Sequence, residues 1–393
     1  MKMHRILAQA AVSLTKSVFR EHQVLDHALA EACEANPKWG KRDRAFLAET
    51  VYEVVRWRRA LAFVADCEEI SALCAAQWTR MGYEIPEWWA HHGCSQDEMR
   101  VRENNLNDQP RAIRESIPDW LDEFAFNQLG EAWDAEISAL NRRAIVFLRV
   151  NRLQATVEEV IAWLASHQVH VEQVLGVENA LCLPQGQVLP KSLRHDGRIE
   201  IQDAGSQLIA PLLDVSGTMR VIDACAGAGG KTLQIAALMR GRGRIDALDV
   251  DAKKLNELRL RAKRAGAAGC IHTHTIGPST PSIYHDTADR LLIDAPCSGL
   301  GTLRRQPDLK WRLKPAMLER IQSLQARLLL DYPAMLKVGG KLVYATCSIL
   351  PSENRQAIEP LIASGNFSLL EERAISPADD GFDGFYAAVL KRN

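Results

Sequence analysis

The stretch from Asp223 to Thr232 reads DACAGAGGKT and separates two segments with different hydrophobic patterns. Residues 219–222 before it are mostly apolar, whereas after it apolar residues recur at the spacing of a helix. The pattern predicts a strand, a glycine-rich turn and the beginning of a helix. Backbone N–H groups and the positive end of a helix dipole meet at such a turn, which makes it a candidate ligand site.

The alternation of strand and helix continues beyond this turn. Strands are expected at 220–224, 244–249, 290–294 and 341–345, and helices at 232–239, 252–265 and 315–336. Strands separated by helices of this length predict an α/β domain with a doubly wound, mostly parallel sheet over residues 199–393. Ligands of such sheets bind beyond the carboxyl ends of the strands, where the glycine turn is expected.

The preceding chain divides into two further regions. Helical periodicity over residues 1–140 predicts an all-α domain, and a β-rich run with an amphipathic helix predicts a small α+β module over residues 141–198. A helix expected near residues 43–61 is rich in arginine and is either a phosphate-contacting face or a solvated basic surface. Its arginines are Arg42, Arg44, Arg56, Arg58 and Arg59, interleaved with Tyr52 and Trp57.

Composition excludes several classes of protein. No apolar run in the 393 residues approaches the ~20 residues of a membrane span, so we expect a cytoplasmic protein without a membrane partner. Nine cysteines at irregular spacings, none in a C-x-x-C pair, indicate neither a disulfide framework nor a zinc site, although His91, His92 and Cys94 lie close together. We therefore expect no metal. With a net charge of −1, any RNA contact must use local basic patches.

Two familiar phosphate-binding motifs fail on spacing. A Walker A loop ending at Lys231 and Thr232 needs a glycine where Cys225 stands, and a dinucleotide fingerprint needs a third glycine where Thr232 stands. What remains is a glycine turn beside a nucleoside, with an acid about 20 residues further on to bind ribose hydroxyls. Asp249 has this position, and Asp251 is expected to cap the next helix instead.

Two cysteines follow expected strands, Cys297 in the run DAPCSG from Asp294 and Cys347 in the run ATCS from Ala345. A single cysteine is usually a small buried apolar residue, and a disulfide between the two is an alternative that a reducing compartment disfavours. The chemistry that uses two such thiols is methyl transfer to a pyrimidine. A thiolate that adds to carbon 6 makes carbon 5 nucleophilic, and an acid such as Asp294 can stabilise the ring nitrogen.

These motifs resemble the Sun-type, RsmB-like family of S-adenosylmethionine-dependent RNA cytosine-5 methyltransferases. The resemblance is carried by DACAGAGGKT, by DAPCSGLGTLRRQPDLKW at 294–311, by YATCS from Tyr344 and by SENR after Pro351. Upstream, RDRAFLAETVYEVVRWRRAL at 42–61 and FLRVNRL at 147–153 also match. The resemblance implies a NusB-like helical domain, the small module and a Rossmann-like methyltransferase domain. It also implies S-adenosylmethionine as cofactor and RNA as substrate, with ribosomal RNA favoured over transfer RNA, and we expect a monomer.

The resemblance also implies roles for individual residues. Cys347 would be the nucleophile, Cys297 would help to release the product, Asp294 would hold the polar edge of the cytosine and Lys231 would orient the base. The cofactor would be surrounded by Cys225, Ala226, Gly227, Ala228, Gly229, Gly230, Lys231, Asp249 and Asp294. Cys297 as the attacking thiol is one alternative, and a non-catalytic RNA-binding ribosome-assembly factor with a relic cofactor pocket is another.

The sequence departs from the family pattern at two places. Ala228 stands where the loop usually has proline, a change that costs rigidity and keeps the glycines. The acid that usually follows the third strand and holds the adenine side is missing, since residues 272–279 read HTHTIGPS.

Overall fold

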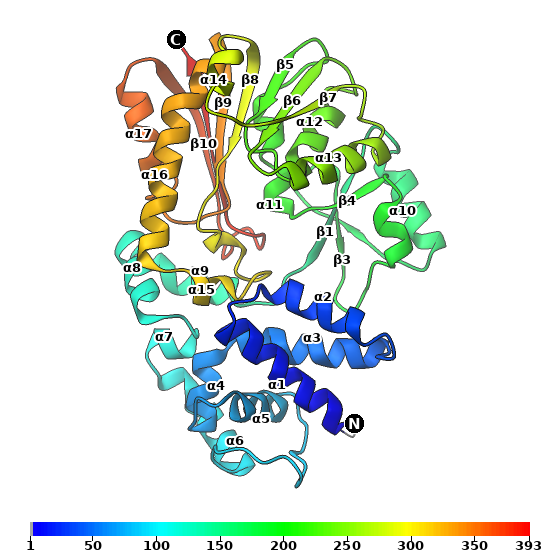
Figure 1. Cartoon of the computed structure of the whole chain (residues 1–393), viewed down its shortest axis with the longest axis vertical. Helices are drawn as coiled ribbons and strands as arrows, with labels where there is room; N and C mark the ends of the chain where they lie inside the picture. The colour runs from blue at the N-terminus through cyan, green and yellow to red at the C-terminus, as the bar shows by residue number, and fades with distance from the viewer. Residues whose placement is uncertain (1–2) are drawn as a thin grey trace. The chain divides into compact units, whose positions relative to one another are not determined.

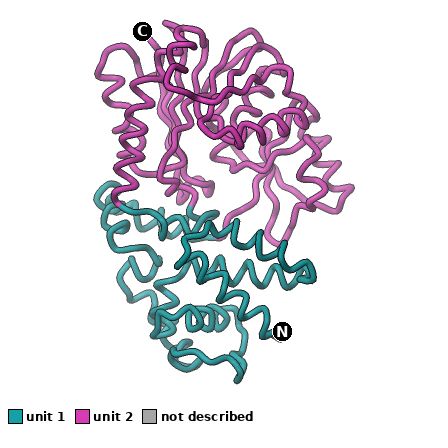
Figure 2. Tube along the Cα trace, in the orientation of Figure 1, with its two compact units in different colours: residues 1–142, 303–314 teal, residues 143–302, 315–393 magenta. Residues whose placement is uncertain are grey.

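The computed structural model describes residues 3–393, which form two compact units (Figure 2). One unit comprises the chain up to Arg142 together with residues 303–314, and the other comprises residues 143–302 and 315–393. These units differ from the three consecutive ranges predicted as 1–140, 141–198 and 199–393. The small module belongs to the same unit as the large sheet, and residues 303–314 belong to the helical unit.

The helical unit buries its apolar residues between short helices. They are α1 (Arg5–Arg20), α2 (Leu25–Ala35), α3 (Lys41–Arg56), α4 (Arg58–Ala65), α5 (Ile70–Arg80), α6 (Gln96–Asn104), α7 (Arg111–Arg114), α8 (Asp119–Leu129), α9 (Ala132–Leu140) and α15 (Leu309–Arg312). The single helix expected near residues 43–61 is divided at Trp57, which ends α3 and precedes α4. Trp78 and Trp133 are fully buried. No helix within residues 3–393 is long and apolar enough to cross a membrane.

The arginines of α3 and α4 are mostly engaged within the helical unit. Arg56 is 3% exposed and its Nη2 donates to the Arg304 carbonyl at 3.1 Å, while the guanidinium carbon of Arg58 lies 4.6 Å from the centre of the Phe19 ring. Arg59 pairs with Asp119 at 2.7 Å. This row is therefore neither a free phosphate-contacting face nor a wholly solvated one.

Residues 303–314 are integrated into the helical core. The Trp311 indole N–H donates to the Val55 carbonyl at 2.7 Å, and Asp308, 2% exposed, accepts the Leu25 N–H at 3.4 Å. Lys310 is fully buried, with its Nζ 3.2 Å from Asn141 Oδ1. The second half of the motif at 294–311 is thus structural in this unit.

The small module is a four-stranded antiparallel sheet with one helix. Its elements are β1 (Val146–Val150), α10 (Val157–Ser166), β2 (Glu172–Gln173), β3 (Ala180–Leu183) and β4 (Ile199–Ile201), with strand order β2-β3-β1-β4 within the described residues. Leu148, Leu164 and Leu181 pack between the sheet and α10. Strand β4 lies just beyond the predicted end of the module at residue 198.

The large sheet has the order β10-β11-β9-β8-β5-β6-β7 within the described residues. Its strands are β5 (Arg220–Asp223), β6 (Arg244–Asp249), β7 (Ile271–Thr275), β8 (Ala288–Asp294), β9 (Leu336–Thr346), β10 (Phe367–Ile375) and β11 (Phe385–Arg392). Strands β5 to β9 pair in parallel, whereas β11 pairs antiparallel with both β9 and β10. The direction of strand succession reverses at β5, and ligands of open α/β sheets bind at such a point.

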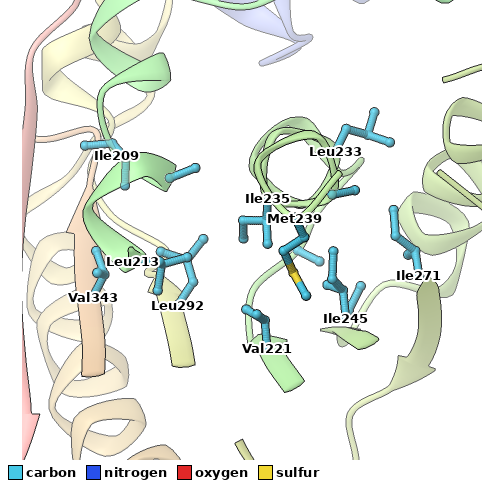
Figure 3. Packing of buried hydrophobic residues seen from close by; sticks show 14 of the residues in the cluster. Ile209, Leu213, Val221, Leu233, Ile235, Met239, Ile245, Ile271, Leu292 and Val343 are labelled. Atoms are coloured by element: carbon cyan, nitrogen blue, oxygen red, sulfur yellow. The ribbon is translucent and has the colours of Figure 1, made fainter. Parts of the chain in front are cut away.

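Helices cover both faces of this sheet (Figure 1). Helices α12 (Gly230–Leu238) and α13 (Ala252–Arg264) lie on one face, and α16 (Pro315–Asp331) and α17 (Arg355–Ala363) on the other; α11 (Ala204–Gln207) and α14 (Thr280–Ile283) are single turns. Neighbouring strand residues alternate between the two cores, so Val221 packs beneath α12 beside Ile235 and Met239 (Figure 3), whereas Ile222 faces the other side. The predicted multidomain α/β architecture is confirmed.

The main differences from prediction are β7, which was not among the predicted strands, and the region after residue 315. The helix expected to reach residue 336 ends at Asp331, and a 3₁₀ turn containing Pro333 (Tyr332–Met335) follows it. Strand β9 then begins at Leu336, several residues earlier than predicted. The β10–β11 hairpin was not predicted; its outer strand β10 is largely exposed and lacks the apolar run that identifies a central strand.

Candidate active site

The residues singled out from the sequence gather at the carboxyl ends of β5, β6, β8 and β9. The glycine loop, residues 225–231, connects β5 to α12 and includes the first two residues of that helix. Gly227 and Gly229 have φ values of +54° and +92°, a region that favours glycine. A Cβ on Gly229 would lie 2.0 Å from Leu258 Cδ1, whereas a Cβ on Gly227 would meet nothing within 4 Å. The loop is packed tightly against α13 at Gly229 and is open at Gly227.

Asp249 at the end of β6 holds the glycine loop through hydrogen bonds to its carboxylate. One oxygen accepts the Gly227 N–H at 2.8 Å, and the other accepts the Asp251 N–H at 2.8 Å. Asp251 in turn accepts the Lys253 N–H at 2.8 Å and caps α13, as predicted. The role of Asp249 toward a ribose stays a prediction, and the structure assigns it a further role in fixing the loop.

Asp223 is the last residue of β5 and lies just before the loop in the chain. It is 1% exposed and accepts a hydrogen bond from the Thr232 hydroxyl at 2.7 Å. Burial raises the pKa of Asp223 to about 7, because a charged carboxylate is poorly solvated there. Its other oxygen has no hydrogen-bond partner among the described residues. The sequence alone predicted no role for Asp223.

Lys231 and Asp294 form an ion pair across the ends of α12 and β8. Lys231 Nζ donates to Asp294 Oδ2 at 2.7 Å and lies 5.4 Å from the centre of the Phe385 ring. Burial lowers the pKa of Lys231, but the charge of Asp294 and its hydrogen bond raise it further, so the net pKa lies above the ordinary value. The site therefore offers a charged ammonium donor and a carboxylate acceptor side by side.

The two cysteines predicted to act together are in contact. Cys297 Sγ lies 3.2 Å from Cys347 Sγ, and both are free thiols. The hydrogen bond with Cys347 and then burial raise the pKa of Cys297 well above its ordinary value. The Cys347 carbonyl accepts the Gly301 N–H at 3.0 Å, which ties the two cysteine loops together at the backbone.

Glu353 is a site residue that sequence reasoning missed. Its fully buried carboxylate accepts the Ser298 N–H at 2.7 Å, the hydroxyl groups of Ser298 and Ser348, and the Gln325 side-chain N–H at 3.2 Å. Ser298 follows Cys297 and Ser348 follows Cys347, so one carboxylate holds both cysteine loops. The motif SENR contained the signal, but hydrogen bonds to both loops could not be deduced from it.

The segment that lacks the expected acid forms part of β7 and the turn after it. Residues 272–275 lie in the strand, and the Ile276 N–H donates to the Asp249 carbonyl at 2.9 Å. His274 Nε2 lies 3.4 Å from Asp246. In the described part of the chain, no group of three or more histidine, cysteine or acidic side chains is arranged to hold a metal ion.

Comparisons with known proteins identify a family of methyltransferases. Residues 210–391 match the family described as 16S rRNA methyltransferase RsmB/F, and residues 117–189 match the ferredoxin-like domain of RsmF/B-like methyltransferases. The chain is 31% identical over 297 residues to the ribosomal RNA small subunit methyltransferase B of Shewanella oneidensis, covering 72% of this chain and 69% of that protein.

Two further relatives extend the comparison. A probable ribosomal RNA small subunit methyltransferase B of Bacillus subtilis is 35% identical over 217 residues, 55% of this chain, and this chain spans only about half (48%) of that protein. The crystal structure of a methyltransferase homolog protein from Pyrococcus horikoshii superposes with a TM-score of 0.63 at 26% identity, over 74% of this chain and 99% of that one. With its sheet, glycine loop and paired cysteines, the chain belongs to the RsmB/F family of methyltransferases.

Proposed function

We propose that this protein methylates carbon 5 of a cytosine in small-subunit ribosomal RNA. The observation that carries the proposal is the contact between Cys297 and Cys347, 3.2 Å apart beside the Lys231–Asp294 pair. Methylation at carbon 5 requires a thiol and polar groups near it, and the two thiols and the Lys231–Asp294 pair support this assignment. Ribosomal RNA is favoured because the named relatives are ribosomal RNA methyltransferases.

S-adenosylmethionine, the methyl donor of this methyltransferase family, supplies an electrophilic methyl group when bound. The glycine loop from Cys225 to Lys231 and the acids Asp249 and Asp294 would hold it. The left-handed turns of the loop and its open side at Gly227 suit a bound nucleoside. Asp249 already accepts the Gly227 N–H, so its carboxylate lies beside the position proposed for the ribose.

Cys347 is the proposed nucleophile. It loses its proton, and its sulfur forms a bond to carbon 6 while the electrons of the C5–C6 double bond move into the ring and make carbon 5 nucleophilic. Asp294 and Lys231 face the polar edge of the cytosine and stabilise the charge that builds on the ring. Once carbon 5 carries the methyl group, its hydrogen leaves as a proton to solvent, as the Cys347 proton did. The electrons of that C–H bond re-form the C5–C6 double bond, and the sulfur–carbon 6 bond breaks with its electrons returning to the Cys347 sulfur. Cys297 assists this release.

Two cysteine variants test the proposal. Cys347→Ala should abolish methyl transfer from S-adenosylmethionine to small-subunit ribosomal RNA, measured by bisulfite sequencing. Cys297→Ala should accumulate a covalent protein–RNA adduct, visible as a slowly migrating band, because the adduct forms and is not resolved. Cys33→Ala in the helical unit is the matched control and should behave as the wild type.

Each alternative has a distinct outcome. Methylation retained by Cys347→Ala would overturn the assignment of the nucleophile. Methyl groups found on transfer RNA alone would change the substrate class. A wild-type protein that does not bind S-adenosylmethionine at near-millimolar concentration would favour an RNA-binding factor with a relic pocket.

A further inference from the structure

Arg149 of the small module reaches the glycine loop. It lies on β1, is 3% exposed, and its Nη1 donates to the Gly230 carbonyl at 2.6 Å and also to the Gln202 side-chain oxygen. Burial lowers the pKa of Arg149 to about 10, and the charge of Glu200 acts in the opposite direction. Burying a guanidinium group is costly unless its N–H groups are hydrogen-bonded. A charge-assisted hydrogen bond from a buried arginine to a backbone carbonyl is therefore strong and holds that part of the loop in place.

Arg261 on α13 holds the same loop at a second point. Its Nη1 donates to the Ala228 carbonyl at 2.7 Å, and its Nη2 donates to Glu200 at 2.7 Å. Glu200 on β4 is the cross-strand partner of Arg149 on β1. The two arginines and Glu200 therefore form one network that connects the module sheet to the carbonyl groups of Ala228 and Gly230, on either side of Gly229.

The module itself is fixed to α13. The Asn151 side-chain N–H group donates to the carbonyls of Gly197 and Ala265, at 2.8 and 2.9 Å. Gly197 has a φ of +96°, and a Cβ there would lie 2.4 Å from the Arg264 carbonyl oxygen, so the module backbone packs directly against the end of α13. Because the module is anchored at this second place, Arg149 acts from a rigid support.

We propose that Arg149 and Arg261 are positioning residues that hold the glycine loop in the conformation that binds S-adenosylmethionine, which gives the small module a part in cofactor binding. The inference rests on the proposed function of the loop. It also accounts for Ala228, which stands where the family usually has proline. A hydrogen bond from Arg261 to the Ala228 carbonyl restrains the backbone at the position where a proline ring would otherwise do so.

The test is the affinity for S-adenosylmethionine, measured by calorimetry on the full chain. Arg149→Gln and Arg261→Gln should each weaken binding roughly tenfold or more, because each removes a charge-assisted hydrogen bond to the loop. In steady-state kinetics the KM for S-adenosylmethionine should rise, with the KM for RNA unchanged. Arg259→Gln is the matched control, since Arg259 lies on the same helix and its exposed side chain donates to Thr273 and Asn256.

A rescue variant separates loop positioning from general destabilisation. Adding Ala228→Pro to Arg261→Gln should recover part of the lost affinity, because the ring restricts the loop without replacing the arginine. Wild-type affinity in both single variants would overturn this inference and leave the proposed function intact. If Arg149→Gln does not fold, Arg261→Gln and its rescue decide the matter. Absence of cofactor binding by the wild type would overturn the proposed function and this inference together.

Discussion

The sulfur atom of Cys297 lies 3.2 Å from that of Cys347, at the ends of the adjacent parallel strands β8 and β9. The hydrogen bond with Cys347 is the largest cause of the raised pKa of Cys297. A raised pKa keeps Cys297 protonated at neutral pH, which suits a residue that assists after the nucleophile has attacked.

This relationship predicts the pH profile of alkylation. In the wild type, iodoacetamide should modify Cys297 only at a pH well above the ~8.5 of an ordinary thiol. In Cys347→Ala the midpoint of the profile should move to lower pH, because the hydrogen bond that raises the pKa is gone. Mass spectrometry of the modified peptide gives the midpoint, which unlike the bare rate does not depend on access. An unchanged midpoint would contradict the prediction.

The Lys231–Asp294 pair predicts a non-additive effect on stability. Asp294→Asn should lower the free energy of unfolding by about 2–3 kcal/mol, because it leaves the ammonium of Lys231 buried without its counter-charge. Adding Lys231→Met should recover much of that stability, since no buried charge remains, while methyl transfer stays abolished. Chemical denaturation measures the first quantity and the methylation assay the second. Additive losses would show that the pair is not coupled.

Glu353 should be required for the geometry of both cysteines. Glu353→Gln keeps the size of the side chain, but its amide nitrogen cannot accept a hydrogen bond. One oxygen of Glu353 accepts both serine hydroxyls and the other accepts the Ser298 N–H and the Gln325 side chain, so one of these two sets is lost and stability should fall by about 1–3 kcal/mol. The yield of covalent RNA adduct in a Cys297→Ala background should fall as well. Glu359→Gln on the exposed side of α17 is the control. Undiminished adduct formation would show that Glu353 is not required for the geometry of the cysteines.

The two glycines of the loop should respond differently to alanine. Gly229→Ala forces a methyl group against Leu258 at a left-handed φ, so it should destabilise the protein by about 2–4 kcal/mol. Gly227→Ala meets no neighbour and should cost only about 1–2 kcal/mol for its φ. Gly227→Ala should nevertheless weaken binding of S-adenosylmethionine, because its methyl group projects into the open side of the loop. Thermal melting and calorimetry distinguish these outcomes.

Lys310 predicts a pH dependence for the helical unit. Burial, followed by the charge of Arg56, lowers the pKa of Lys310 well below its ordinary value. Between the lowered pKa and the ordinary ~10.4, the unfolded chain binds a proton at Lys310 that the folded chain does not. The free energy of unfolding therefore increases as the pH rises through this window. Lys310→Met should remove this slope. Denaturation followed by tryptophan fluorescence measures the free energy of unfolding at several pH values. Equal pH slopes for the wild type and Lys310→Met would show that Lys310 is charged in the folded state.

The parts of the molecule that are local in sequence could be predicted. The strand–turn–helix around Asp223–Thr232 depends on hydrophobic period and glycine placement within a short window, and so does the capping of α13 by Asp251. Topology then places residues such as Asp294 and Cys347 at one edge of the sheet, because parallel strands end together. Because these residues share that edge, contacts of Lys231 with Asp294 and of Cys297 with Cys347 could be expected.

The remaining features depend on contacts between residues distant in sequence. Arg56 and Lys310 have the sequence appearance of solvated or RNA-facing cations, yet both are buried by partners more than a hundred residues away. Glu353 acquires its role only when the loops at Ser298 and Ser348 come together. No local pattern shows that Arg149 reaches the glycine loop, because its partner Gly230 lies 81 residues further along the chain.

The placement of residues 303–314 in the helical unit has a consequence for synthesis on the ribosome. The intervening residues 143–302 number 160, and at about 5–20 residues per second they take roughly 8–32 s to translate. Throughout that interval the backbone groups of Leu25 and Val55 lack the partners that Asp308 and Trp311 later provide. The helical unit thus acquires its last segment only after most of the other unit has been made.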